Sequence, residues 1–125
     1  MASLEVHQKK YQLFRNDALS TGTSEPTRIG ACFEACFHLI EACAALQRLH
    51  INKHQLVREV LEQSPAVIGE GTEVVWQAFQ ELENQIRPGQ LYGGAINGER
   101  LQRALELLAR IEAVCLPILR KAEKK

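Results

Sequence analysis

Apolar residues recur every three or four positions along most of this chain, which is the spacing of an amphipathic helix. Short stretches of small polar residues, glycine or proline interrupt this spacing and mark the breaks between helices. We expect an all-α fold, an antiparallel bundle of four to five helices, in a single domain over residues 1–125. The predicted helices cover residues 4–19, 25–50, 52–64, 72–86 and 98 into the 120s.

The second predicted helix is the most apolar segment of the chain. A helix that is apolar nearly all round is buried among other helices, so we expect this one to form the centre of the bundle. Its polar positions form one stripe, made by Glu34, His38 and Glu41. Two interpretations stay open: the stripe is a solvated face with pairing between side chains one turn apart, or it meets Arg87 and Tyr92.

The segment between the fourth and last predicted helices carries the candidate chemistry. A helix does not pass cleanly through proline followed by glycine, so the chain breaks there, with Arg87 at the end of one helix and Tyr92 just beyond it. A guanidinium group can bind a phosphate through paired hydrogen bonds. The chain as a whole matches no standard catalytic motif. The segment reads Ile86-Arg87-Pro88-Gly89-Gln90-Leu91-Tyr92-Gly93-Gly94.

Charge and hydropathy limit the classes of function. The 15 basic and 15 acidic residues give a formal net charge of zero, so no overall field attracts the chain to nucleic acid or to an anionic membrane. No run approaches the roughly 18 consecutive apolar residues of a membrane helix. The first residues also lack the basic and apolar regions of a secretory signal. We therefore expect a cytoplasmic protein with no membrane partner.

The cysteines and histidines form no metal-binding pattern in the sequence, and we expect neither a metal nor a cofactor. Cys32, Cys36 and Cys43 lie along one stripe of the second helix and span about 16 Å, which is too far to reach one ion. We expect them to pack in the core as small apolar side chains, without disulfides. Three further histidines have no supporting groups, and the last two are expected to be exposed beside a short turn; they are His7, His50 and His54.

Three segments of the chain resemble the HEPN superfamily of small helical bundles. Residues 35–42, Ala-Cys-Phe-His-Leu-Ile-Glu-Ala, look like the aromatic-histidine-alanine run of the second HEPN helix. Residues 52–56 are similar to the short loop and the helix that follows it. Residues 86–94 look like the HEPN motif of arginine, four to six residues, then histidine, with Tyr92 in the histidine position. The resemblance covers about residues 4–119.

The resemblance implies a homodimer, with the arginine motifs of both chains near the interface. Some HEPN proteins are metal-independent ribonucleases, in which the histidine and arginine act on the 2′-hydroxyl and the scissile phosphate. Others are partners of nucleotidyltransferases in toxin–antitoxin-like pairs. This chain departs from the nuclease pattern, because Pro88 follows Arg87 where a polar residue is usual. It also has Tyr92 in place of histidine, and a phenol with a pKa near 10 is a poor base at neutral pH.

The candidate site residues are therefore Arg87, Tyr92, His38 and Glu34, where His38 replaces the missing base if it faces Arg87. The first hypothesis is a dimeric HEPN-like binding or regulatory protein that acts on RNA or with a nucleotidyltransferase partner, with little or no catalysis. The second is a metal-independent ribonuclease that uses Arg87 and Tyr92. The third is a purely structural or interaction bundle, in which the break is an ordinary loop.

Overall fold

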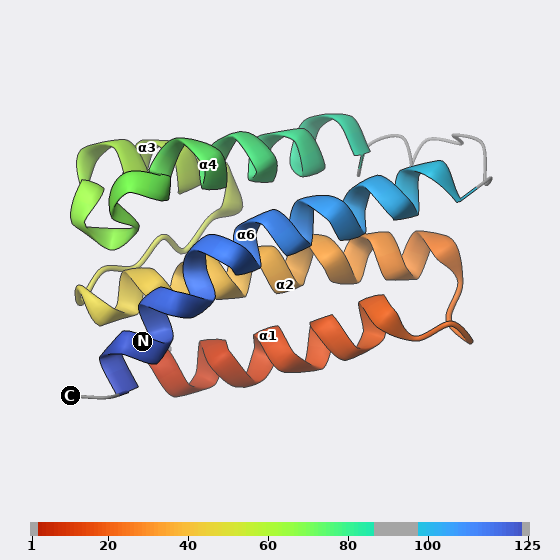
Figure 1. Ribbon diagram of the computed structural model, residues 1–125, viewed down its shortest axis with the longest axis horizontal. Helices are drawn as coiled ribbons and strands as arrows, with labels where there is room; N and C mark the ends of the chain where they lie inside the picture. The colour runs from red at the N-terminus through yellow and green to blue at the C-terminus, as the bar shows by residue number, and fades with distance from the viewer. Residues whose placement is uncertain (1–2, 87–97, 124–125) are drawn as a thin grey trace.

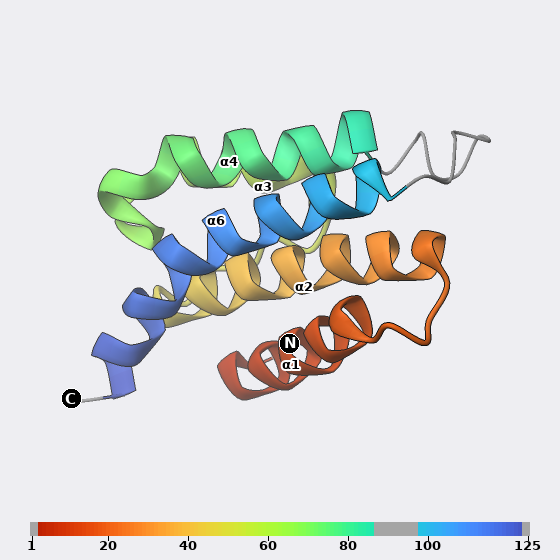
Figure 2. The same ribbon diagram turned by 45° about the vertical axis from the view of Figure 1, so that its right-hand side comes forward.

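The computed structural model describes residues 3–86 and 98–123, and the regular elements within these ranges are all helical (Figure 1). Helices α1 and α4 run in one direction, and α2 and α6 run in the other (Figures 1 and 2). The predicted all-α class is confirmed, and the arrangement is compatible with a helical bundle. The elements are α1 (Leu4–Leu19), α2 (Glu25–Leu46), η1 (His54–Leu56), α3 (Val57–Gln63), η2 (Pro65–Val67), η3 (Gly69–Gly71), α4 (Thr72–Glu81), η4 (Leu82–Ile86) and α6 (Glu99–Glu123).

The first two helices begin where the sequence predicts. The hydroxyl groups of Ser3 and Ser24 each accept a hydrogen bond from a backbone N–H in the first turn of the helix that follows. Pro26 lies in the first turn of α2, where its missing N–H costs nothing. Arg28 then ties the start of α2 to the end of α1, because its Nε donates to the carbonyl of Ala18 at 2.8 Å.

Helix α2 forms the centre of the core, as its apolar pattern predicts. Leu39 and Ile40 are fully buried, and α2 packs along both α1 and α6. Phe33 of α2 stacks on Phe79 of α4 with their ring centroids 5.1 Å apart. All four cysteines are buried and free, so the prediction of core cysteines without disulfides is confirmed. Burial of each large apolar side chain contributes about 1.5–3 kcal/mol.

Helix α2 ends at Leu46, four residues before the predicted end. Arg48 has a φ of 59°, and the N–H of Leu49 bonds the carbonyl of Ala44 at 3.0 Å. This is a Schellman motif, in which a residue in the left-handed conformation ends the helix. The usual signal for that conformation is glycine, but arginine occupies the position here. The sequence pattern therefore gave no sign of the helix end.

The segment after α2 differs most from the prediction. The spacing of Asn52 and Gln55 in the sequence predicts a capping box, but this box does not form. Asn52 has a φ of 66°, and η1 begins at His54 without a side-chain cap. Helix α3 is only 7 residues long, and it ends at Gln63 with Ser64 as its C-cap, before Pro65 as predicted. The helical pattern over 52–64 therefore folds as a short 3-10 turn followed by a short α-helix.

Helix α4 begins against α6. The sequence predicts Thr72 as its N-cap, but Gly71 occupies that position. A Cβ at Gly71 would lie 2.4 Å from a methyl group of Val114 on α6, so only glycine allows this close approach without a shift. Beyond Glu81 the helix continues as the π-helix η4 to Ile86, which is the predicted end.

Helix α6 passes through Pro117 and continues to Glu123. The sequence predicts a kink or an early end to the regular pattern. The helix does not end at Pro117, and its last turns bend away from the line of its first part (Figures 1 and 2). The predicted N-cap of this helix, Asn97, lies outside the described residues.

Helix α2 is long and apolar enough to cross a membrane by length and hydropathy alone. Within the bundle, 72% of its most apolar window is buried. The central helix of a helical bundle meets the same two criteria. Core packing therefore accounts for the apolar surface of α2.

Candidate functional site

The structure describes two of the four residues that the sequence nominates. Arg87 and Tyr92 lie outside the described residues. Glu34 and His38 lie one turn apart on α2, with His38 Nε2 3.7 Å from Glu34 Oε2. The side chain of Glu34 is 41% exposed, whereas that of Glu41, at the other end of the polar stripe, is only 4% exposed. The solvated-face interpretation of the stripe therefore holds at Glu34 and is wrong at Glu41.

The end of the bundle where α6 begins is remote from His38. Gly98, the first described residue after the 87–97 segment, donates its N–H to Glu25 Oε1 at 3.2 Å. Glu25 is the first residue of α2, and His38 lies about 20 Å further along the helix at 1.5 Å per residue. Gly98, at one border of this segment, therefore lies far from His38.

His38 is enclosed by other rings. It is 9% exposed, and its ring stacks on Phe14 of α1 with centroids 5.7 Å apart. Phe37 meets the same ring edge-on at 5.6 Å. The Nδ1 atoms of His38 and His7 are hydrogen-bonded at 3.1 Å. Burial, followed by the nearby His7 and Lys10, lowers the pKa of His38 to about 4. The imidazole is therefore neutral at pH 7.

Glu41 is the centre of a buried polar cluster. Its Oε1 accepts a hydrogen bond from the backbone N–H of Ile51 at 2.8 Å. Its Oε2 lies 3.6 Å from His7 Nε2 and 4.0 Å from His50 Nδ1. Burial lowers the pKa of His7, although the charge of Glu41 opposes that shift. The expectation that His7 and His50 lack supporting groups is wrong, and so is the expectation that His50 is exposed, since its side chain is only 17% exposed.

Three elements bring this cluster together. His7 lies near the start of α1, and the antiparallel hairpin places it against the later turns of α2, which carry Glu41. The Schellman turn then returns the chain, so that His50 and Ile51 approach Glu41 from the loop. The sequence contained a signal for the approach of His7 to the later turns of α2. If α1 and α2 pair antiparallel about Gly22, position 7 falls opposite position 37.

His54 forms a separate pair between η1 and η4. Its Nδ1 is hydrogen-bonded to a carboxylate oxygen of Glu83 in η4, and its ring meets Phe33 edge-on at 5.2 Å. Its side chain is 32% exposed, so it is half-buried rather than exposed as expected. In the described ranges, no third metal-ligating side chain joins this pair. The pair holds η1 against η4.

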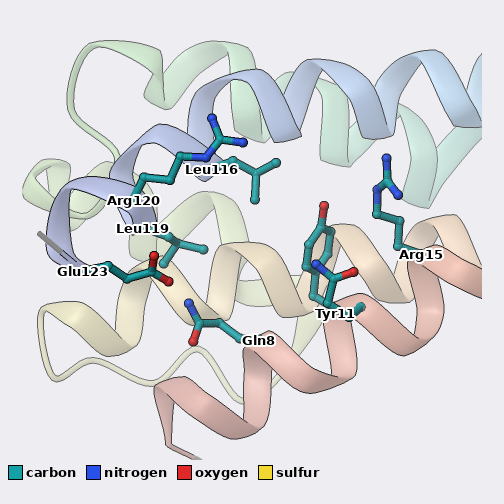
Figure 3. Close-up of a pocket in the computed structure, with 8 residues that line it drawn as sticks. Gln8, Tyr11, Arg15, Leu116, Leu119, Arg120 and Glu123 are labelled. Atoms are coloured by element: carbon teal, nitrogen blue, oxygen red, sulfur yellow. The ribbon is translucent and has the colours of Figure 1, made fainter.

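A second polar site lies between α1 and α6 (Figure 3). The hydroxyl of Tyr11 donates to Glu112 Oε2, and Arg15 Nε donates to the same oxygen at 2.7 Å. Burial, followed by the Glu112 carboxylate, raises the pKa of Tyr11, so the phenol stays protonated. A cleft of about 440 Å³ opens beside this network; it is lined by Gln8, Tyr11, Gln12, Arg15, Leu116, Leu119, Arg120 and Glu123.

Comparison with known proteins assigns no family or function to this chain. The chain matches no family model, no curated protein and no solved structure. The HEPN resemblance therefore remains an expectation drawn from short motifs.

Proposed function

We propose that this chain is a HEPN-like helical-bundle binding or regulatory protein that forms a homodimer. It acts with a nucleotidyltransferase partner in a toxin–antitoxin-like pair, or on RNA, and it binds without catalysing a reaction. The all-α fold is compatible with this proposal, and the motif around Arg87 supplies its candidate binding group.

The observation that carries the proposal is the enclosure of His38. A general base must come within hydrogen-bond reach of the proton that it abstracts. His38 is 9% exposed, its Nδ1 is engaged by His7, and Phe14 covers its ring. With a pKa near 4, its imidazole is also a weak base. Because Tyr92 is a poor base at neutral pH, neither candidate supports ribonuclease chemistry, and binding is the better interpretation.

The charge balance favours a protein partner over RNA. Affinity for RNA comes largely from contacts between basic side chains and phosphates. In this chain, 15 basic residues are matched by 15 acidic ones. The exposed Arg120 and Lys121 near the end of α6 form a local basic patch, but Glu123 lies in the same turn. Nucleic acid therefore remains the alternative ligand.

The outer face of α1 offers a position at which to test the dimer. Val6 and Leu13 are seven residues apart, which places them on one face of the helix, and they are 40% and 64% exposed. Polar side chains of the same helix surround Leu13 in a shallow hollow. A charge placed at Leu13 would oppose the packing of a second chain on this face.

An RNA degradation assay tests the absence of catalysis. Wild-type protein and Arg87→Ala are incubated with RNA in EDTA, and circular dichroism confirms that both are folded. We expect neither protein to cleave RNA. Cleavage by the wild type that is lost in folded Arg87→Ala would overturn the proposal and identify a metal-independent ribonuclease.

Light scattering after size exclusion tests the dimer. We expect a mass twice the 14.0 kDa of one chain. Leu13→Asp should lower this mass, whereas Val74→Asp should leave it unchanged, because Val74 is a comparably exposed apolar residue on α4. A wild-type protein that stays monomeric at every concentration would contradict the dimer.

A further inference from the structure

We infer that His7, Glu41 and His50 are the ligands of a zinc-class divalent transition-metal ion, held between α1, α2 and the loop that follows α2. This inference is independent of the proposed binding function. The observation behind it is a group of three metal-ligating side chains from three separate elements. One ligand atom of each lies within 4.8 Å of the ligand atoms of the other two.

The spacing of the three side chains suits a single small ion. Two ligand atoms of a tetrahedral zinc ion, each about 2.0 Å from the metal, lie about 3.3 Å apart. His7 Nε2 is 3.6 Å from Glu41 Oε2, and His50 Nδ1 is 4.0 Å from the same oxygen. Side-chain movements of less than about 1 Å would bring the atoms to coordinating distance. No backbone rearrangement is needed.

The charge of the cluster also points to a cation. A buried carboxylate is costly unless it is paired. In residues 3–86 and 98–123, no ion pair joins Glu41 to a lysine or an arginine. Its two neighbours with basic side chains are His7 and His50. The Nδ1 atom of His50 is itself buried without a hydrogen-bond partner. A bound cation would satisfy the Glu41 charge and this nitrogen together.

The surrounding hydrogen bonds leave the coordinating atoms available. The N–H of Ile51 holds Glu41 Oε1, which leaves Oε2 facing the histidines. The Nδ1 of His7 is hydrogen-bonded to His38 Nδ1. When His7 Nδ1 donates this bond, the Nε2 atom of His7 carries the lone pair, and Nε2 is the atom that faces Glu41. Metal-bound histidines usually donate their second N–H to a neighbouring acceptor, which fixes the tautomer and orientation of the ring. His38 fills that supporting role here.

The donor set identifies the class of ion. Two imidazole nitrogens and one carboxylate oxygen suit zinc and its neighbours in the first transition row, whereas calcium and magnesium prefer oxygen donors alone. Three protein ligands leave a fourth tetrahedral position for water or for a small ligand. His50, at the partly exposed edge of the cluster, is the side from which such a ligand would enter.

Zinc titration of the untagged full-length protein tests the site. The protein is first stripped with a chelator, and zinc binding is then measured by competition with a chromogenic chelator. We expect one zinc ion per chain. Glu41→Gln and His50→Asn should each weaken binding by more than about 100-fold, since even loss of a supporting hydrogen bond costs 10–100-fold. His54→Asn should bind zinc as the wild type does, because His54 pairs with Glu83 outside the cluster.

Cobalt binding separates this site from the four buried cysteines. The proposed ligands contain no sulfur, so the cobalt-loaded protein should show the visible bands of a tetrahedral ion without a sulfur-to-metal charge-transfer band. The half-buried position of His50 makes His50→Asn the safer variant if Glu41→Gln fails to fold. Absence of zinc binding by the wild type would overturn the inference. So would a sulfur band, or binding that folded His50→Asn retains in full.

Discussion

Side chains of α1 contact two carboxylates, Glu112 and Glu41, and these two carboxylates have different partners. Glu112 on α6 accepts hydrogen bonds from both Tyr11 and Arg15, and the guanidinium of Arg15 supplies a positive charge at 2.7 Å. Glu41 on α2 is more deeply buried, with a side chain that is 4% exposed against 15% for Glu112. It nevertheless receives one backbone hydrogen bond and two histidines at longer distance.

The difference separates a structural ion pair from a buried carboxylate whose side-chain neighbours are two histidines. A buried charge is stable when a fixed partner of opposite charge accompanies it, and removing one partner of such a pair is costly. Glu112 has a fixed partner within the fold. The partners of Glu41 are two histidines and a backbone N–H, so among the described residues no lysine or arginine supplies this carboxylate with a permanent countercharge. Substitution of each glutamate by its neutral isostere should therefore give different results.

Glu112→Gln should cause the largest loss of stability. The amide has nearly the shape of the carboxylate, but it removes the charge that Arg15 pairs with and weakens the acceptor of the Tyr11 hydrogen bond. We expect the free energy of unfolding to fall by about 2 kcal/mol. Urea denaturation followed by circular dichroism measures this change. A loss below about 0.5 kcal/mol, the size seen for many exposed pairs, would mean that the network is not a structural pair.

Tyr11→Phe should have a smaller effect. Tyr11 is 3% exposed, and the substitution removes only its hydroxyl, while Arg15 continues to neutralise Glu112. Loss of one hydrogen bond to a charged group should lower the free energy of unfolding by about 1.5 kcal/mol. The same urea experiment gives the value. If Tyr11→Phe cost as much as Glu112→Gln, the hydroxyl rather than the Arg15 charge would hold the carboxylate.

The sequence predicted the long helices well, because their signals are local. The serine caps of α1 and α2 and the repeated apolar positions lie within each helix. The end of α2 was predicted four residues late, because Arg48 adopts a left-handed conformation that normally marks glycine. The short 3-10 turns after Asn52 were missed because they depend on how the chain returns over the core, which no local pattern records.

The sequence could predict less of the site, because the site depends on long-range packing. His38 and Glu34 were nominated from one helix, and their spacing is indeed one turn. The cluster around Glu41 joins His7, which is 34 positions earlier in the chain, to His50 beyond a turn that the sequence did not show. Only the hairpin register carried a hint of the first contact. The contact with His50 depends on the turn that ends α2, which the sequence prediction placed four residues too late.

Glu41→Gln in the metal-free protein should have the smallest effect, and it tests the comparison most directly. The amide oxygen still accepts the hydrogen bond from Ile51, and the substitution removes a buried charge without separating it from a fixed cationic partner. We expect the free energy of unfolding in chelator to change by less than about 0.5 kcal/mol, since replacing an uncompensated buried charge by a neutral group costs little.

Zinc should then distinguish the wild type from Glu41→Gln. A ligand that binds only the folded state stabilises it by an amount that grows with the ligand concentration relative to the dissociation constant. Zinc should therefore raise the melting temperature of the wild type and leave that of Glu41→Gln unchanged. Glu112→Gln provides the matched control, because it should respond to zinc as the wild type does. If Glu41→Gln instead destabilised the metal-free protein as strongly as Glu112→Gln, a protonated histidine would already neutralise Glu41. The two carboxylates would then belong to the same class of structural pair.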